Sequence, residues 1–387
     1  ASLSGETKDV VSIGNNSPSD NTIFEIWIDE VAVSRNKIPW APATGIAVDR
    51  RLSRIAPSDL PQSFSIAFGS CNVSSRLPYM NTALAAAAAA QPDVFVHLGD
   101  FGYPDTGAYM PTENGYRAFW DDLLFEDSLS QLTTRPWLFV ASDHDLGGNN
   151  IDHQTVSPHA LSAYTKWHNN PVGQAAGRYG AIKLAAALVL VCLHTISAPS
   201  QTDPPHGTNK TCLGESQNIW LLNLLAATSA DLLIIASQTA FGHDSDSGWA
   251  QYQGEREVIL AACQASTAIV RWITGDHHSA RWVKMPGDVV EWGAAPFAEV
   301  PQVCTSAASF AEESTCVSRV ALSSTGRVIQ RNEVIETLTR EELEESTSFG
   351  IVEIDSERRS ARFAVLDSKG RTRMTADNAP MTETFRY

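Results

Sequence analysis

The sequence predicts an α/β protein built around a parallel sheet, and two patterns along the chain support this prediction. Residues 64–71 read as an apolar strand, residues 81–91 as an alanine-rich helix, and residues 92–98 as a second buried strand. A strand–helix–strand unit of this kind is typical of parallel sheets. Further strand-like runs follow, and several end on acids, histidines or a cysteine. The chain of 387 residues, 43% of them hydrophobic, suffices for one large domain or two ordinary ones.

The central stretch is residues 92–105, a buried strand that stops at Gly99-Asp100. Glycine lets the backbone turn sharply, so Asp100 stands at the carboxyl end of a strand. Open α/β sheets bind their ligands at that end. The alternative is a turn aspartate that caps the next segment.

The remaining elements follow from hydrophobic spacing. We expect helices over residues 114–130, 155–170, 217–227 and 249–265. We expect strands over residues 137–141, 184–194, 231–237 and 268–274, and a last hairpin with strands 349–354 and 361–366.

Residues 1–44 form a separate N-terminal β segment in this interpretation, because apolar and polar residues alternate there with period two. The pattern is similar to the final strands of a laminin-G-like jelly roll, which implies a carbohydrate or surface contact. Residues 45–61 are then a linker, and residues 62–387 the main domain.

The formal net charge of −16 argues against a nucleic-acid backbone or an anionic membrane as partner, and suits a site that gathers cations. No apolar run approaches the roughly 20 residues of a membrane span. Six cysteines, an even count in an acidic chain, favour a secreted or periplasmic protein. Cys304 and Cys316 flank a loop that a local disulfide would close, and Cys192 reads as a buried thiol.

Polar side chains collect where the predicted strands end. The candidate ligands are thiolate, carboxylate, imidazole, phenol and amide groups: Cys71, Asp100, Tyr103, Asp143, His144, Asn149 or Asn150, Asp276 and His278. Mixed sulfur, nitrogen and oxygen donors in one pocket suit a multinuclear metal site, and Asp100 suits the bridging role. Two or three cations about 3.5–4 Å apart clamp a phosphoryl group. His97 lies inside its strand and is predicted to be a core histidine or to support a ligand.

Six motifs in order resemble the PhoD-like branch of metallophosphatases, over about residues 62–280. They are Phe-Gly-Ser-Cys at 68–71, Leu-Gly-Asp-Phe-Gly-Tyr at 98–103, Ser-Asp-His-Asp-Leu-Gly-Gly-Asn-Asn at 142–150, Leu-Gly-Glu-Ser-Gln-Asn-Ile-Trp-Leu at 213–221, the spacing of Trp249, Tyr252, Glu255 and Arg256, and Gly-Asp-His-His-Ser at 275–279.

The resemblance implies a four-layer α/β/β/α metallophosphatase sandwich that holds iron (Fe³⁺) and calcium (Ca²⁺), with other divalent metals as alternatives. It implies that Cys71 and Tyr103 bind iron and that Asp100 bridges the metals. The other implied metal ligands are Asp143, Asn149, Asn150, Asp276 and His278.

The implied catalytic residues are Asp100 and His144, and His144 would protonate the leaving group. For His144, Cys71 and Tyr103 a purely structural role is the alternative. His144 would then hydrogen-bond a ligand carboxylate, Cys71 would be a buried thiol, and Tyr103 a core tyrosine.

One departure concerns substrate binding. The family usually has Asp-x-Arg on the strand at 191–196, where this chain has Leu-His-Thr-Ile at 193–196. Phosphate would instead be held by the metals alone or by other side chains; the candidates are His194, Lys210, Gln238 and Arg256.

The sequence therefore predicts a metal-dependent phosphoesterase of the alkaline phosphatase D type. It would hydrolyse phosphomonoesters or phosphodiesters by attack of metal-bound hydroxide. One alternative is a phosphotriester or organophosphate hydrolase on the same scaffold, since a triester carries less charge. The other is a catalytically silent, metal-containing surface-binding module.

Overall fold

The computed structural model describes the chain in two separate units, residues 1–51 and 52–387. The described residues are 10–14, 23–27, 60–73, 82–106, 112–124, 126–149, 151, 155–167, 173–174, 179–195, 211–242, 248–276, 278, 280–294, 297, 316–322, 328–334, 347–375 and 379–387. In the first unit, β1 (Val10–Gly14) pairs antiparallel with β2 (Ile23–Trp27). The predicted disulfide between Cys304 and Cys316 lies outside the part whose side chains are described.

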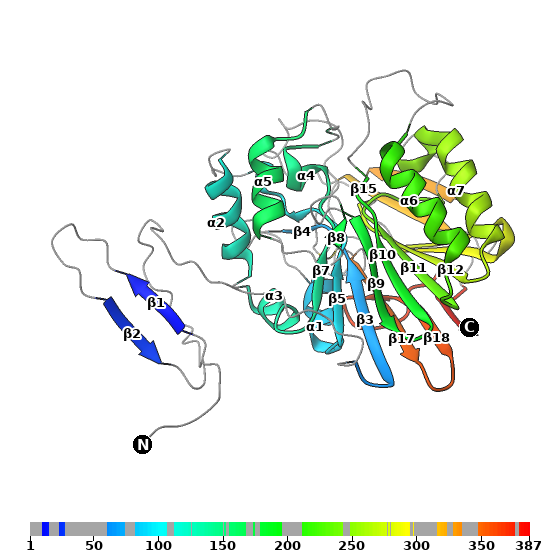
Figure 1. Ribbon diagram of the computed structural model, residues 1–387, viewed down its shortest axis with the longest axis horizontal. Helices are drawn as coiled ribbons and strands as arrows, with labels where there is room; N and C mark the ends of the chain where they lie inside the picture. Colours follow the sequence, from blue (N-terminus) through cyan, green and yellow to red (C-terminus); the bar gives the residue numbers. More distant parts are fainter. Residues whose placement is uncertain are drawn as a thin grey trace. The chain divides into compact units, whose positions relative to one another are not determined.

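The second unit contains two large mixed sheets (Figure 1). One has the order β19 (Thr382–Arg386), β18 (Ser360–Asp367), β17 (Ser348–Asp355), β3 (Ser63–Gly69), β5 (Val94–His97) and β7 (Trp137–Phe139). The other has the order β13 (Arg281–Met285), β14 (Val289–Gly293), β12 (Ile269–Thr274), β11 (Leu232–Ser237), β10 (Leu188–Cys192), β9 (Tyr179–Ala185) and β8 (Gly173–Gln174). Parallel pairs run from β3 through β5 to β7, and from β10 through β11 and β12 to β14.

Helices cover the outer face of each sheet. Those near the six-stranded sheet are α1 (Thr82–Ala89), α2 (Glu113–Leu123), α3 (Asp127–Leu132) and α5 (Pro158–Trp167). Those on the seven-stranded sheet are α6 (Gly214–Ala227) and α7 (Gln253–Ala265), on the right of Figure 1. Short elements complete the description: β4 (Asn72–Val73), β6 (Phe101–Gly102), a 3₁₀ turn over Pro104–Thr106, α4 (Asp143–Leu146), 3₁₀ turns over Gly248–Tyr252 and Pro286–Asp288, and the antiparallel pair β15 (Cys316–Leu322) and β16 (Val328–Val334).

Alternate residues of each strand face opposite sides, and this alternation builds the layers. Ile66 and Val96 of one sheet and Leu190 and Ile234 of the other share the core between the sheets. Their neighbours along the strands pack outwards against the two helix layers. The predicted four-layer α/β/β/α sandwich is therefore confirmed.

Two predictions of individual elements were wrong in detail, and two strands were missed. The strand predicted over residues 184–194 is a hairpin of β9 and β10, because the chain turns within its alanine run. The helix predicted over 114–130 is two helices, α2 and α3. The sheet-edge strands β13 and β19 were not predicted.

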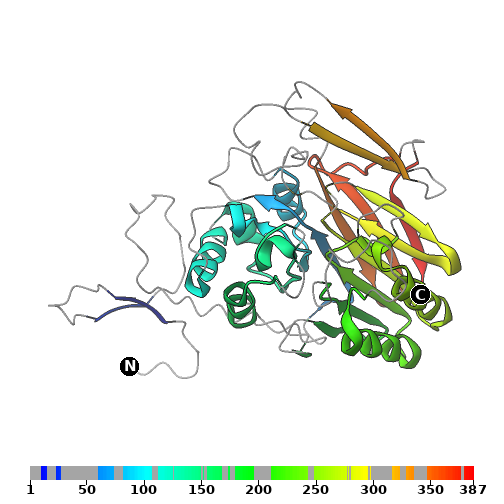
Figure 2. The ribbon, with the colours of Figure 1, turned by 90° about the horizontal axis from the view of Figure 1, so that it is seen from above.

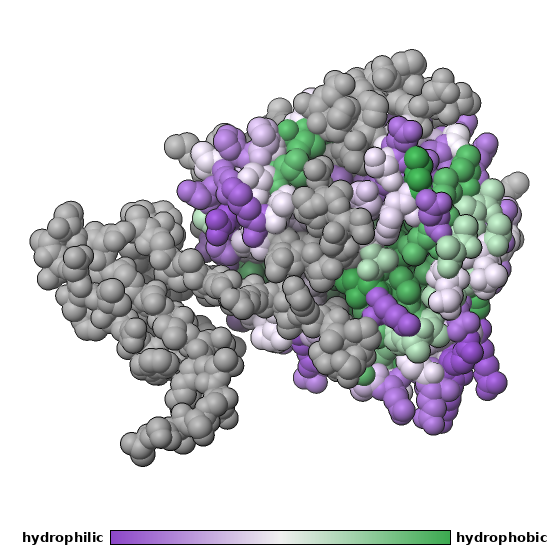
Figure 3. All heavy atoms as spheres, viewed as in Figure 1, coloured by the Kyte–Doolittle hydropathy of each residue, from purple (hydrophilic) through white to green (hydrophobic). Residues whose placement is uncertain are grey.

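Figure 3 shows hydrophilic residues over α2, whereas hydrophobic residues gather over β9 and β10. Ile182 and Ala185 of β9 are partly buried and pack against the core between the sheets. Seen from above in Figure 2, the C-terminal strand lies along the outer edge of its sheet. No helix among the described residues is long and apolar enough to cross a membrane.

Candidate metal centre

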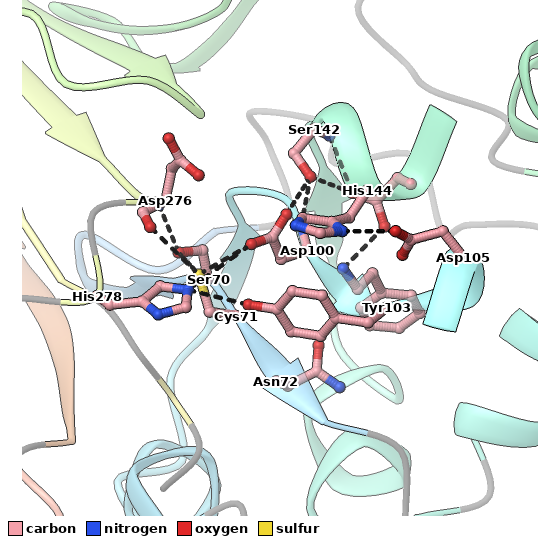
Figure 4. Close-up of polar contacts among 12 residues, drawn as sticks. Ser70, Cys71, Asn72, Asp100, Tyr103, Asp105, Ser142, His144, Asp276 and His278 are labelled. Atoms are coloured by element: carbon pink, nitrogen blue, oxygen red, sulfur yellow. Dashed lines mark hydrogen bonds and ion pairs between the residues drawn. The ribbon is translucent and has the colours of Figure 1, made fainter. Parts of the chain in front are cut away.

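The candidate site lies where the parallel strands of the two sheets end. After β3 and β5 the chain continues side by side, with Leu98 N–H donating to Gly69 O at 2.7 Å and Cys71 N–H to Gly99 O at 3.1 Å. From the other sheet, Gly275 follows β12 and packs against Ser70, where a Cβ would lie 2.6 Å from the serine Oγ. The predicted strand-end residues are thus brought together (Figure 4).

A first donor group consists of Cys71, Asp100 and His278, whose ligand atoms lie within 4.8 Å of one another. Cys71 Sγ lies 3.3 Å from Asp100 Oδ2, and His278 Nε2 lies 4.0 Å from the same oxygen. Tyr103 extends this group, because its hydroxyl is 3.0 Å from His278 Nε2. Thiol, phenol, carboxylate and imidazole groups therefore lie close together.

A second donor group consists of Asp100, Asp143 and His144, again with ligand atoms within 4.8 Å of one another. Asp100 belongs to both groups, as expected of a carboxylate between two cations. It is 1% exposed, so water does not compete for its oxygens. Asp100 is therefore the residue that the two donor groups share, and its bridging role stays a prediction.

Five candidate ligands adopt left-handed backbone conformations. The φ angles are 61° at Cys71, 55° at Asp100, 56° at Tyr103, 67° at Asp276 and 48° at His278. Such residues are uncommon outside glycine, and each costs on the order of 1–3 kcal/mol. Their concentration at one sheet edge indicates a functional site whose geometry the surrounding fold enforces.

His144 is held by Asp105. The imidazole Nδ1 lies 2.8 Å from Asp105 Oδ2, and the ring packs edge-on against Tyr103 at 4.7 Å. Burial alone would lower the pKa of His144, but Asp105 and the charges of Asp100 and Asp143 raise it to about 10. The other ring nitrogen points towards Asp100 in Figure 4, so a protonated His144 presents a donor to the site.

The cluster contains more acidic side chains than cationic ones. Burial and the charge of Asp100 raise the pKa of Cys71 and of Tyr103 well above their ordinary values. Burial and the charges of Asp143 and Asp100 do the same to the pKa of Asp276. Burial opposes ionisation of Asp100 too, but hydrogen bonding to His278, the His144 charge and Ser142 hold its pKa below the usual range. A cation would stabilise all four ionised groups, so this donor set fits a metal site.

Ser142 and Asp145 support Asp100 from the start of α4. Ser142 Oγ accepts the Asp100 N–H at 2.7 Å and donates to Asp100 Oδ1 at 2.5 Å. Asp145, 0% exposed, accepts the N–H groups of Ser142 and Phe101 at 2.9 and 2.8 Å. Burial and the charge of Asp100 raise the pKa of Asp145 to about 8.

The remaining predicted residues lie in the turn after α4, on α7 or outside the described residues. Asn149 is exposed in the turn after α4, and Asn150 and Lys210 lie outside the described residues. Arg256 lies on α7, in the helix layer over the seven-stranded sheet.

The proposed substrate-binding residues of the second sheet lie at neighbouring strand ends. His194 and Gln238, 3% and 6% exposed, follow β10 and β11. Gln217 of α6 fixes the His194 backbone, bonding its N–H at 2.8 Å and its carbonyl at 2.7 Å. Their contact with a substrate stays a prediction.

Sequence reasoning missed Asp105 and the supporting role of the serines. The pairing of Asp105 with His144 spans 39 positions and has no sequence signal of its own. The expected core role of His97 agrees with its full burial and with its 2.8 Å contact from Nε2 to Asn72 Oδ1. The predicted buried thiol of Cys192 is confirmed.

A family model described as PhoD-like phosphatase matches residues 66–365. The chain belongs to the PhoD-like phosphatase family. Among solved structures, that of PhoD is similar with a TM-score of 0.60 and 16% identity, covering 86% of this chain and 71% of PhoD. At that identity the likeness supports the fold alone.

A dimetal phosphatase from Danio rerio is also similar, with 12% identity, 84% of this chain and 99% of the other covered. Its TM-score of 0.46 is too low to support an argument. No curated protein matches the sequence. Family membership thus rests on the family model, which matches residues 66–365.

Proposed function

We propose that this PhoD-like family member is a metal-dependent phosphoesterase acting on phosphomonoesters or phosphodiesters. The observation that supports this most is the buried Asp100 shared by two donor groups, one with the Cys71 thiol and one with His144. A shared carboxylate suits two adjacent cations, which is the arrangement that phosphoryl transfer uses.

The ligand roles follow from donor chemistry. Cys71, Tyr103 and His278 would hold one cation with Asp100, and iron as Fe³⁺ suits this thiolate and phenolate set. Asp143, Asn149, Asn150 and Asp276 would complete the remaining positions, where oxygen donors suit calcium. When bound, the cations would neutralise charge on the phosphoryl oxygens and activate water.

His144 would act as general acid in this proposal. Its Nδ1–H donates to Asp105, so the tautomer and ring orientation are fixed and the second nitrogen faces the site. A protonated imidazole there would deliver its proton to the leaving alkoxide, a role worth about 10²–10⁴ in rate. His194, Gln238 and Arg256 are proposed to orient the phosphate in place of the missing arginine.

The first experiment is elemental analysis of protein purified without chelator, beside Cys71→Ser. We expect close to one iron per chain, falling in the variant, with calcium alongside. Cys192→Ser is the matched control, because this equally buried thiol lies in the core between the sheets and its loss should leave metal content unchanged.

A panel of mono-, di- and triesters then defines the substrate class. Preference for a triester would favour the organophosphate-hydrolase alternative. Stoichiometric metal without turnover of any ester would favour the binding module, and absence of metal would contradict the proposal. Export from the cytoplasm, and a carbohydrate contact through residues 1–44, stay predictions.

A further inference from the structure

The site contains the same local arrangement twice. Gly99-Asp100 follows β5, and Gly275-Asp276 follows β12; the aspartates have φ angles of 55° and 67°. The Asp100 N–H donates to Ser142 Oγ at 2.7 Å, and the Asp276 N–H donates to Ser70 Oγ at 2.9 Å. Each aspartate is thus held by a serine from another strand end.

Each glycine makes room for the serine that holds its neighbour. A Cβ at Gly99 would lie 2.5 Å from Ser142 Cβ, and a Cβ at Gly275 would lie 2.6 Å from Ser70 Oγ. Contacts that short are sterically forbidden, so any larger residue would push the serine away. The glycine and the serine therefore form one unit at each aspartate.

Each hydroxyl also reaches a donor atom of the candidate metal site. Ser142 Oγ donates to Asp100 Oδ1 at 2.5 Å, and Asp145 Oδ2 lies 3.0 Å from the same hydroxyl. The other carboxylate oxygen, Asp100 Oδ2, faces Cys71 Sγ. Ser70 Oγ lies 3.0 Å from Cys71 Sγ. Both serines are 0% exposed, so no water replaces them in these contacts.

We propose that Ser142 and Ser70 are positioning residues of the metal site, with distinct tasks. Ser142 fixes which oxygen of Asp100 faces the Cys71 side of the site. Ser70 accepts the Asp276 N–H and donates a hydrogen bond to the metal-bound Cys71 thiolate. This hydrogen bond withdraws electron density from the sulfur. The proposal rests on the proposed metal-dependent function.

The test is titration of chelator-treated protein with Co²⁺ alone, followed by the thiolate-to-cobalt absorption band. Ser70→Ala should shift the band to longer wavelength, because a sulfur without its hydrogen bond gives up charge more easily. Ser142→Ala should leave the band in place but weaken Co²⁺ binding about tenfold, because Asp100 can then rotate. Loss of one buried hydrogen bond to a charged group changes a binding constant by about this factor.

Ser237→Ala is the matched control. Ser237 is also 0% exposed at a strand end, but its hydroxyl bonds Thr239, donating to the carbonyl at 2.7 Å and accepting the N–H at 3.2 Å, and not an atom of the two donor groups. Its loss should change neither the band nor the affinity. Thermal unfolding of the metal-free variants measures any general loss of stability separately.

An unshifted band in Ser70→Ala together with wild-type affinity in Ser142→Ala would overturn the proposal, as would equal effects in Ser237→Ala. Should Ser142→Ala fail to fold, the Ser70→Ala band still decides, because its signature is a wavelength. A wild-type protein that binds no Co²⁺ and shows no thiolate band contradicts the proposed function itself, which separates the two failures.

Discussion

Two charge clusters, each formed around a buried charged side chain, differ in how their charges are balanced. Arg271 of β12 is 1% exposed and bonds Glu383 Oε2 at 3.2 Å and the Asp288 carbonyl at 2.7 Å. Its guanidinium also stacks 4.4 Å from the Phe385 ring centroid. Near the other end of the same strand, Asp276 joins Asp100, Asp143 and Cys71, and the histidines supply too little positive charge.

The comparison separates a cluster that serves the fold from one that serves a ligand. The Arg271 cluster meets its own hydrogen-bonding demand and joins β12 to the C-terminal strand β19. The donor cluster leaves acidic groups with raised pKa values, which only an added cation would relieve.

Replacing Arg271 by methionine should give the largest loss of stability. The variant removes a buried guanidinium and leaves Glu383 and the Asp288 carbonyl without it, so we expect about 3 kcal/mol of destabilisation by urea unfolding. Metal content at low temperature should be unchanged. Arg362→Met is the control, because the Arg362–Glu353 pair is exposed and worth about 0–1 kcal/mol. Equal losses in both variants would remove the distinction.

Replacing Asp276 by asparagine should stabilise the metal-free protein but reduce its activity. Phosphoesterase activity should fall by about 10²–10³, or roughly 3–4 kcal/mol, because a ligand carboxylate is lost. The metal-free protein should melt at a higher temperature, since a carboxylate with a raised pKa no longer needs to ionise inside the cluster. The exposed Asp127→Asn should change neither quantity, and a lower melting temperature in Asp276→Asn would contradict the view of an unbalanced cluster.

Replacing Asp105 by asparagine should change the pH profile of activity. Asp105 raises the pKa of His144, which reaches about 10, so the imidazole stays protonated in mildly alkaline solution. Without this carboxylate the pKa falls, and activity at pH near 9 should drop about tenfold while activity near pH 6 changes little. Asp93→Asn is the control, because Asp93 precedes β5, at the strand end opposite the site, and accepts the N–H of Ser65 in β3. A uniform loss at all pH values would argue for a purely structural role.

The metal-free protein should lose stability as pH rises. The folded-state pKa of Asp276 lies above its unfolded value, so its contribution is full below about pH 4 and is lost as pH rises towards the folded value. We expect the melting temperature of chelated protein to fall by a few degrees between pH 5 and pH 8, and less in Asp276→Asn. Added metal should abolish the trend; a trend that persists would place its origin elsewhere.

The sequence supported prediction of the layers because the strands are short, apolar and separated by clear helices. The apolar pattern of residues 184–194 was misleading, because the turn between β9 and β10 lies in alanines, which carry no turn signal. The edge strands β13 and β19 were missed because Lys284, Arg281 and Glu383 break their apolar pattern. Edge strands commonly carry such charges, so pattern alone underestimates them.

The proximity of the candidate ligands was predictable because the ends of parallel strands converge, which brings Cys71, Asp100 and Asp276 together where strands of the two sheets end. Their supports were not predictable. The hydrogen bonds that Asp105, Ser70 and Ser142 make with the candidate site residues depend on the direction in which the loops leave the strands. Ser70 bonds Asp276 across 206 positions, and nothing in either local sequence indicates that contact.

The left-handed backbone at the donor positions also limits protein engineering. A substitution intended to change metal preference has to supply both a suitable donor atom and tolerance of positive φ. Aspartate, asparagine and histidine satisfy the second condition better than most residues. At Cys71 and Tyr103, exchange for aspartate or histidine would therefore relax the backbone while altering the donor. Libraries at these two positions can be kept small, and transplanting the site to another β-sandwich requires its glycines and serines as well as its ligands.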